Sequence, residues 1–194
     1  KLHGFKLRAG AGARMARAAA FIRAMRQPDG LSPVINDGYP VNLAPFLDTL
    51  PKAARPAEKT TFFKNAGMAF WRDKGSFLVF DASPFTGKFS HYHAGKNAVI
   101  LWHGGQPFLV DSGCPNYEDA LFAKWYKSGA AHSGLLVDGR GDGAVAGTYD
   151  WKSWAAPRCT PWRVGKRGPV ISSVLRSSAE GWGGVEWRRA VEVE

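Results

Sequence analysis

From residue 60 onward, the sequence is a succession of short apolar runs separated by turn-forming residues. The runs are rich in Phe, Val and Trp, which favour strands, and Asp73-Lys74-Gly75 between two of them is typical of a hairpin turn. We expect strands at residues 60–65, 68–73, 76–82, 97–103, 107–111, 134–137, 162–164, 170–177 and 185–194, and a short helix at 118–127. Many short strands with frequent turns predict a mainly β fold, an antiparallel β-sandwich.

The first 50 residues have a helical pattern instead. Apolar residues recur at helical spacing over residues 12–27, and Pro28-Asp29-Gly30 then stops the predicted helix. A second, shorter helix is expected at residues 43–50. The next segment contains two prolines and mixed charges, which is typical of a linker. The expected organisation is a helical segment at 1–50, a linker at 51–59 and a β-sandwich domain at 60–194.

Four of the five histidines lie within 21 residues of Asp111, and three of them, His91, His93 and His132, are candidates for a functional site. If His91 and His93 are on extended backbone, their rings leave the same face, because side chains alternate with a period of two. Imidazole nitrogen and carboxylate oxygen are both zinc ligands, so His93, Asp111 and His132 form a candidate ligand set with a fourth position for water or another group. Spacing alone also allows the two histidines of this set to be hydrogen-bonded core residues.

The chain has 26 basic and 16 acidic side chains, giving a formal net charge of +10. This excess favours a polyanionic partner such as nucleic acid, an anionic membrane surface or an anionic polysaccharide, unless it serves only solubility. The basic residues are scattered and form no recognised nucleic-acid motif, so we expect no nucleic acid. No apolar run is long enough to span a membrane. Cys114 and Cys159 form no metal motif, and two free thiols are favoured over a disulfide.

Several motifs follow one another in a specific order. Residues 84–113 contain a glycine-bearing loop, His91-Tyr92-His93, an apolar strand, a Gly-Gln-Pro turn and a Val-Asp-Ser-Gly segment. Farther on, Ala131-His132 precedes Leu-Leu-Val-Asp-Gly, and Asn36-Asp37 lies upstream. Over roughly residues 20–140, this order resembles the heparinase II/III-like family of polysaccharide lyases. The resemblance implies that the chain is a fragment, with the last helices of an α/α toroid followed by a β-sandwich truncated at its C-terminus.

The resemblance also implies roles for individual residues. It assigns a catalytic role to His91 and ligation of a structural zinc ion to His93, Asp111 and His132. More loosely, it places substrate-binding side chains at Tyr126, Lys96 and Asn97, for which a packed aromatic residue and a surface pair are the alternatives. The sequence departs from the family pattern at Gly95, where the family often has Asp, and at Ser133, where it commonly has Asn.

The reaction implied by the resemblance is β-elimination on a uronic-acid-containing anionic polysaccharide, either alginate or a heparin- or heparan-sulfate-like chain. The family also implies a bacterial enzyme that is periplasmic or secreted. Its catalytic tyrosine comes from the helical toroid, and Tyr39 does not match that position. We therefore expect this fragment alone to be inactive. The alternative is a non-catalytic, zinc-stabilised carbohydrate-binding β-sandwich. Oligomeric state is not indicated by the sequence.

Overall fold

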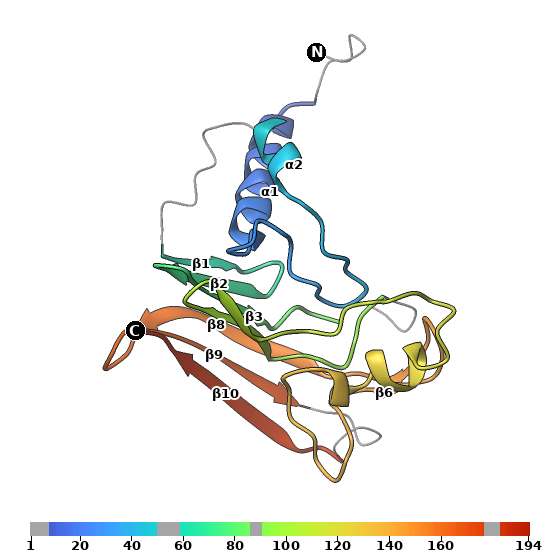
Figure 1. Ribbon diagram of the computed structural model, residues 1–194. Helices are drawn as coiled ribbons and strands as arrows, with labels where there is room; N and C mark the ends of the chain where they lie inside the picture. Colours follow the sequence, from blue (N-terminus) through green and yellow to red (C-terminus); the bar gives the residue numbers. More distant parts are fainter. Residues whose placement is uncertain (1–7, 50–58, 86–90, 177–182) are drawn as a thin grey trace.

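A computed structural model describes residues 8–49, 59–85, 91–176 and 183–194. Its two larger sheets are antiparallel and stack as layers, as Figure 1 shows. The first sheet has the order β1 (Thr60–Phe63), β2 (Met68–Asp73), β3 (Ser76–Asp81), β4 (Ala98–His103), β5 (Gln106–Leu109). The second has the order β10 (Glu186–Glu192), β9 (Pro169–Arg176), β8 (Ala156–Val164). The predicted antiparallel β-sandwich is confirmed.

The central strands of the first sheet are buried on both faces, which explains their continuous apolar sequences. Leu78 and Phe80 of β3 face the second sheet and pack in one cluster with Ile171 of β9. Phe77 and Val79, which alternate with them, belong to a second cluster on the opposite face, beneath the helix. Because successive side chains of a strand point to opposite faces, a strand buried between two layers needs apolar residues at every position.

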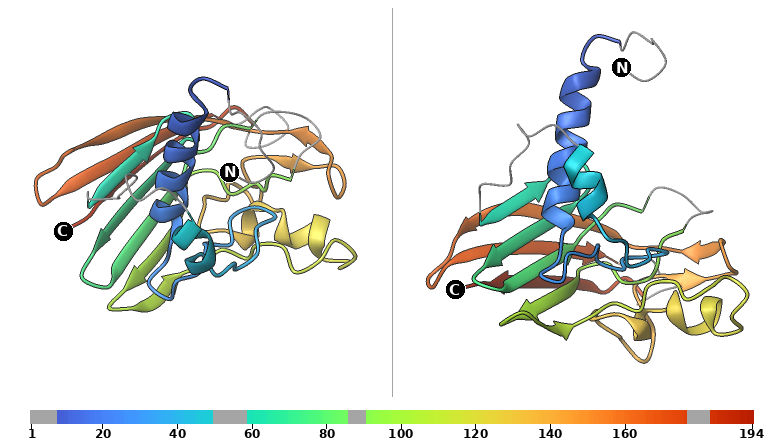
Figure 2. Two further views of the ribbon diagram at one scale, coloured as in Figure 1. Left: turned by 90° about the horizontal axis from the view of Figure 1, so that it is seen from above. Right: turned by 45° about the horizontal axis from the view of Figure 1, so that its top comes forward.

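The long helix α1 (Ala11–Met25) agrees with the prediction at 12–27 and stands on the outer face of the first sheet, as both views in Figure 2 show. Its C-terminal end contacts the sheet through Ala24 and through Phe21, whose ring meets that of Phe63 edge to face at 4.9 Å. The guanidinium of Arg72 donates to the carbonyl of Ala24, satisfying a carbonyl that the helix end leaves unpaired. Among the described helices, none combines the length and apolar character needed to cross a bilayer.

Some predicted elements differ from those observed. The short helix α2 (Ala44–Thr49) was expected, whereas the predicted strand at 134–137 is wrong. There, Asp138 and Gly139 adopt positive φ and close a tight turn with a single bridge, Val137 to Arg140. The predicted helix at 118–127 is reduced to a five-residue π-helix, η1 (Phe122–Tyr126), followed by a 3-10 turn, η2 (Gly129–Ala131).

Two short strands, β6 (Ala144–Val145) and β7 (Trp151–Ser153), were not predicted. Strand β8 begins six residues before the expected strand at 162–164. The prediction missed its first part because Pro157 and Pro161 are typical of a loop. Pro161 lies where the register with β9 shifts, between Thr160 and Arg163, a position that tolerates proline. Residues 51–58 of the predicted linker at 51–59 lie outside the described residues.

Three loops meet at one end of the sandwich. They are the loop after α1, residues 91–97 before β4, and the chain from β5 through η1, which Figures 1 and 2 show side by side. Gly113 marks one close approach: a Cβ atom there would lie 2.9 Å from the carbonyl oxygen of Gly38, and its φ of +57° also favours glycine. The loops are therefore packed against each other.

Candidate metal centre

The three predicted ligands come together at the meeting point of these loops. His93 precedes β4, Asp111 lies just after β5, and His132 follows η2. One ligand atom from each residue lies within 4.8 Å of the other two. Their side chains are almost completely buried, with exposed fractions of 1%, 7% and 1% respectively. The structure thus assembles a compact set of two imidazoles and one carboxylate.

The hydrogen bonds of these side chains fit a bound cation. His132 Nδ1 lies 2.7 Å from Asp111 Oδ2. His93 Nδ1 and His132 Nε2 are buried, and neither has a hydrogen-bond partner among the described residues. An unpaired buried nitrogen is costly, so two in one cluster suggest a ligand that accepts their lone pairs. Burial lowers the pKa of His93, which favours the neutral imidazole that metals bind. The donor set suits zinc.

Gly95 gives the His132 ring its space. A Cβ atom at residue 95 would lie 2.7 Å from Cγ of that ring and 3.1 Å from its Nδ1. Because Cγ is close to the root of the side chain, the imidazole cannot simply rotate away. The departure from the family pattern at this position therefore has a steric consequence in this chain.

We expect Gly95→Ala to displace the His132 imidazole and weaken zinc binding by roughly 10- to 100-fold, the range seen when the support of a ligand is disturbed. Competition with a chromogenic chelator measures this affinity. Gly134→Ala is the matched control, because a Cβ atom at Gly134 meets nothing within 4 Å. Equal zinc affinity in the two variants would contradict the proposed packing.

A carboxylate from the helical segment joins the two neighbouring histidines. Asp37 Oδ2 lies 2.6 Å from His91 Nδ1, and Asp37 Oδ1 lies 2.8 Å from His93 Nε2. Burial alone would raise the pKa of Asp37, but the hydrogen bonds from both histidines outweigh it and lower that pKa. In the sequence, Asn36-Asp37 is recognisable only as part of a motif, and its spacing does not predict these contacts.

Two tyrosines surround His91, whose side chain is 62% exposed. Among the described residues, the aromatic rings in contact with it are those of Tyr117 at 6.1 Å and Tyr149 at 5.1 Å between centroids. The Tyr117 hydroxyl donates to Asp37 Oδ2 at 3.1 Å, and burial together with that carboxylate raises the pKa of Tyr117. No sequence spacing indicated either tyrosine, because folding alone brings them to His91.

The structure buries Lys96 and Asn97, for which the resemblance implied contact with substrate. Both are buried, with exposed fractions of 2% and 0%. The ammonium of Lys96 donates to the Ser83 hydroxyl at 2.8 Å and lies 3.7 Å from an Asp81 oxygen, so its charge is compensated inside the protein. Asn97 has a positive φ of 63°, as suits the turn into β4. The contacts of Lys96 are therefore structural, whereas the side-chain amide of Asn97 has no hydrogen-bond partner among the described residues.

Tyr126 ends the π-helix and is half-buried. Its ring packs edge to face on Trp125 with centroids 5.0 Å apart, and its carbonyl faces the Ser112 hydroxyl at 3.5 Å. Tyr117 and Tyr149, rather than Tyr126, form the aromatic surroundings of His91. Cys114 and Cys159 are both free thiols, as the sequence favoured.

Comparisons with known proteins agree with the architecture. A family model described as "Heparinase II/III-like, C-terminal" matches residues 55–194. A crystal structure of heparinase III has a TM-score of 0.70 and 16% identity, over 95% of this chain and 33% of that one. A crystal structure of heparan sulfate lyase HepC from Pedobacter heparinus has a TM-score of 0.64 and 22% identity, over 87% of this chain and 28% of that one. No curated protein matches the sequence. The chain spans about a third of these structures, and the likeness shows the fold.

Proposed function

This chain belongs to the heparinase II/III-like family, and from that premise we propose that the protein containing it is a polysaccharide lyase. The substrate is a uronic-acid-containing anionic polysaccharide, cleaved by β-elimination. The observation that carries this proposal is the division between the two histidines of the His-x-His motif. His91 is 62% exposed and His93 is 1% exposed, although both hydrogen-bond the same carboxylate. One ring is accessible to a substrate, and the other belongs to the candidate ligand set.

The chemistry of β-elimination suits an exposed imidazole. A base first removes the C5 proton of the uronic acid, which is weakly acidic because it lies next to a carboxylate. Neutralising that carboxylate stabilises the developing enolate. The 4-O-linked sugar then leaves with a proton from a general acid. His91 Nδ1 donates to Asp37, which leaves Nε2 facing outward. In the neutral ring Nε2 accepts a proton, and only in the doubly protonated ring does it donate to the uronate or to the leaving oxygen. We assign His91 to this step.

The ligand set has a supporting role in this proposal. His93, Asp111 and His132 would hold a zinc ion that, when bound, ties together the three loops around the site. Elimination needs no attacking water, so a structural zinc suffices. What this chain supplies is the position of His91, two residues from a ligand that is fixed in a packed core.

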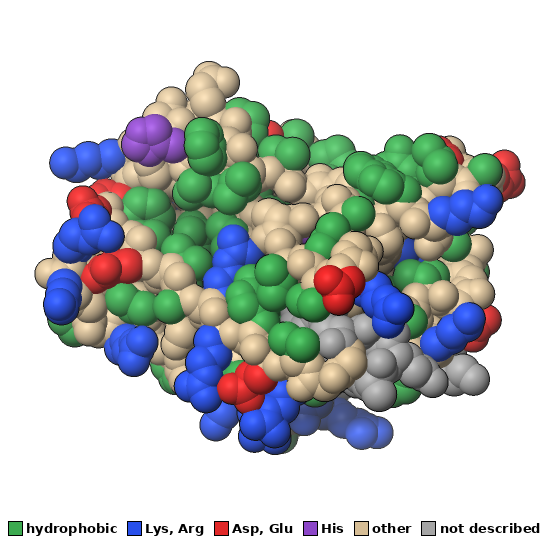
Figure 3. Space-filling model, turned by 90° about the horizontal axis from the view of Figure 1, so that it is seen from below, with side chains coloured by type: hydrophobic (Ala, Val, Ile, Leu, Met, Phe, Trp, Pro, Cys, Tyr) green, Lys and Arg blue, Asp and Glu red, His purple; other side chains and the backbone are tan. Residues whose placement is uncertain are grey.

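We propose that residues 1–50 are the end of a helical toroid, and that a tyrosine from the preceding helices completes the active site. The positive net charge favours a polyanionic substrate. Figure 3 shows Lys and Arg side chains spread over one face of the molecule, interspersed with acidic ones. Such a distribution fits a long, repeating polyanion better than one compact anionic ligand. We further propose a periplasmic or secreted location, on the family resemblance.

The test is a substrate panel with the full-length protein. Heparan sulfate comes first, because one structurally similar protein is named a heparan sulfate lyase, followed by heparin, hyaluronan and alginate. We expect one of them to give the ultraviolet absorbance of an unsaturated uronate. Zinc binding and polysaccharide binding without any such product would refute the lyase proposal and support the non-catalytic carbohydrate-binding alternative.

A further inference from the structure

We propose that Asp37 is a positioning residue that fixes the ring orientation and the protonated nitrogen of both His91 and His93. The inference rests on the proposed function, because it states how His91 and His93 are prepared for catalysis and metal binding. It concerns a residue of the helical segment that acts on the β-sandwich, 54 and 56 residues away in sequence.

The carboxylate of Asp37 uses its two oxygens for two different rings. Oδ2 is 2.6 Å from His91 Nδ1 and Oδ1 is 2.8 Å from His93 Nε2. An ionised carboxylate only accepts hydrogen bonds, so each of these ring nitrogens must carry its hydrogen. His91 therefore has Nδ1–H and presents Nε2 outward, whereas His93 has Nε2–H and presents Nδ1 inward.

The inward nitrogen is the one that a metal would need. His93 Nδ1 is buried without a hydrogen-bond partner among the described residues, and His93 is a member of the candidate ligand set. Histidines that bind metals commonly donate their second N–H to a carboxylate, which sets the tautomer and increases the basicity of the ligating nitrogen. Asp37 accepts such a hydrogen bond from Nε2 of His93 and a second one from Nδ1 of the exposed His91.

Other contacts hold Asp37 in place. The neighbouring Asn36 accepts a hydrogen bond from the backbone N–H of His93 at 3.0 Å. The turn at Asn36-Asp37 therefore hydrogen-bonds both the main chain and the side chain of His93. Asn36 adopts a φ of +55°, which an asparagine tolerates better than most residues. The Tyr117 hydroxyl is a further donor to Asp37 Oδ2. The Asp37 side chain is only 8% exposed. These contacts fix the position of the Asp37 carboxylate between the two histidines.

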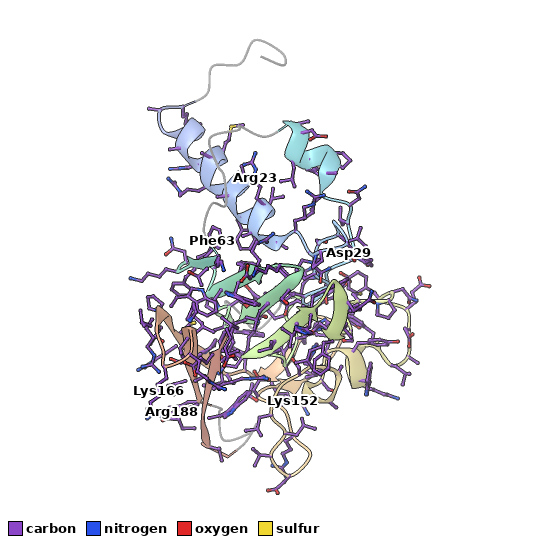
Figure 4. All side chains as sticks on the ribbon, turned by 60° about the vertical axis from the view of Figure 1, so that its left-hand side comes forward. Arg23, Asp29, Phe63, Lys152, Lys166 and Arg188 are labelled. Atoms are coloured by element: carbon purple, nitrogen blue, oxygen red, sulfur yellow. The ribbon has the colours of Figure 1, made fainter. Side chains whose placement is uncertain are left out.

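The test compares Asp37→Asn with Asp29→Asn in the full-length protein. An asparagine keeps the shape of Asp37 but has only one accepting oxygen, so one histidine would face an amide N–H and lose its partner. Asp29 is the matched control: it lies in the loop that follows α1 (Figure 4), and its carboxylate accepts from the backbone N–H of Leu31 in the same loop. A role of Asp37 in shape alone predicts wild-type behaviour for both variants.

We expect Asp37→Asn to reduce zinc affinity by about 10- to 100-fold in chelator competition, and Asp29→Asn to leave it unchanged. With zinc at saturation, kcat should fall by a similar factor while KM changes little, because a misoriented His91 affects the chemical step more than binding. Unchanged zinc affinity and kcat in Asp37→Asn would overturn the inference.

A third measurement needs neither zinc nor turnover. Nitrogen-15 NMR of labelled histidines should show Nδ1–H for His91 and Nε2–H for His93 in the wild type, with at least one altered in Asp37→Asn. The opposite tautomers in the wild type would refute the inference. If no polysaccharide is cleaved but these shifts change as expected, the proposed function fails while the role of Asp37 stands.

Discussion

Replacement of His91 by alanine is expected to reduce the lyase activity of the full-length protein by about 10²- to 10⁴-fold, the usual contribution of a general acid or base. The same variant should keep its zinc. His91 contacts Asp37 through Nδ1 and is not one of the three clustered ligands. When its ring is removed, Tyr117 still donates to Asp37 Oδ2, so the carboxylate remains anchored beside His93. The substitution is therefore expected to lower the rate of the elimination step and to leave zinc binding unchanged.

Initial rates of unsaturated-uronate formation and zinc content per chain measure the two halves of this prediction. His103→Ala is the control, since His103 lies exposed at the end of β4 and contacts the Ser76 hydroxyl at 3.4 Å. It should retain both activity and zinc. Loss of zinc in His91→Ala would contradict the division of roles between His91 and His93, and full activity in that variant would remove His91 from the mechanism.

The parts of the fold that were predictable are those in which local sequence and burial agree. Strands β2, β3 and β4 are apolar runs because both of their faces are covered, so their pattern was sufficient. Strand β8 was found only in part, because its prolines mimic a loop and its tolerance of Pro161 depends on a register shift with β9. The register shift depends on pairing with β9, so the sequence of β8 alone does not reveal it.

The same contrast applies to the site. His93, Asp111 and His132 were predictable because their chemical types and motif order point to one ligand set, and the structure brings them together. Asp37 was missed because a turn aspartate looks the same in sequence whether it faces solvent or a histidine. The burial of Lys96 was missed for a related reason. A lysine beside an asparagine is typical of a surface. Only the fold shows that the Lys96 ammonium hydrogen-bonds Ser83 and pairs with Asp81.

Removal of a single ligand is expected to abolish zinc binding at micromolar metal and, with it, the stabilisation that zinc gives. His93→Ala, Asp111→Ala and His132→Ala each leave two ligands, too few for a structural zinc site. A ligand that binds only the folded state stabilises it by about 2.7 kcal/mol when its free concentration is 100 times Kd. The wild type should therefore lose stability by about this amount when a chelator strips the metal, and the three variants should not respond to the chelator.

The response to chelator distinguishes metal loss from ordinary core damage. His93 and His132 are nearly fully buried, so alanine at either position also leaves a cavity and lowers stability without any metal. Measuring each protein with and without chelator cancels that cavity effect, because it is present in both conditions. His103→Ala should show the full wild-type response, since it touches none of the ligands. A ligand variant that retains one zinc per chain, or that is still destabilised by the chelator, would remove that residue from the ligand set. Since His91 is only two residues from His93, such a result would also leave the exposed histidine without the fixed support that the proposed mechanism requires.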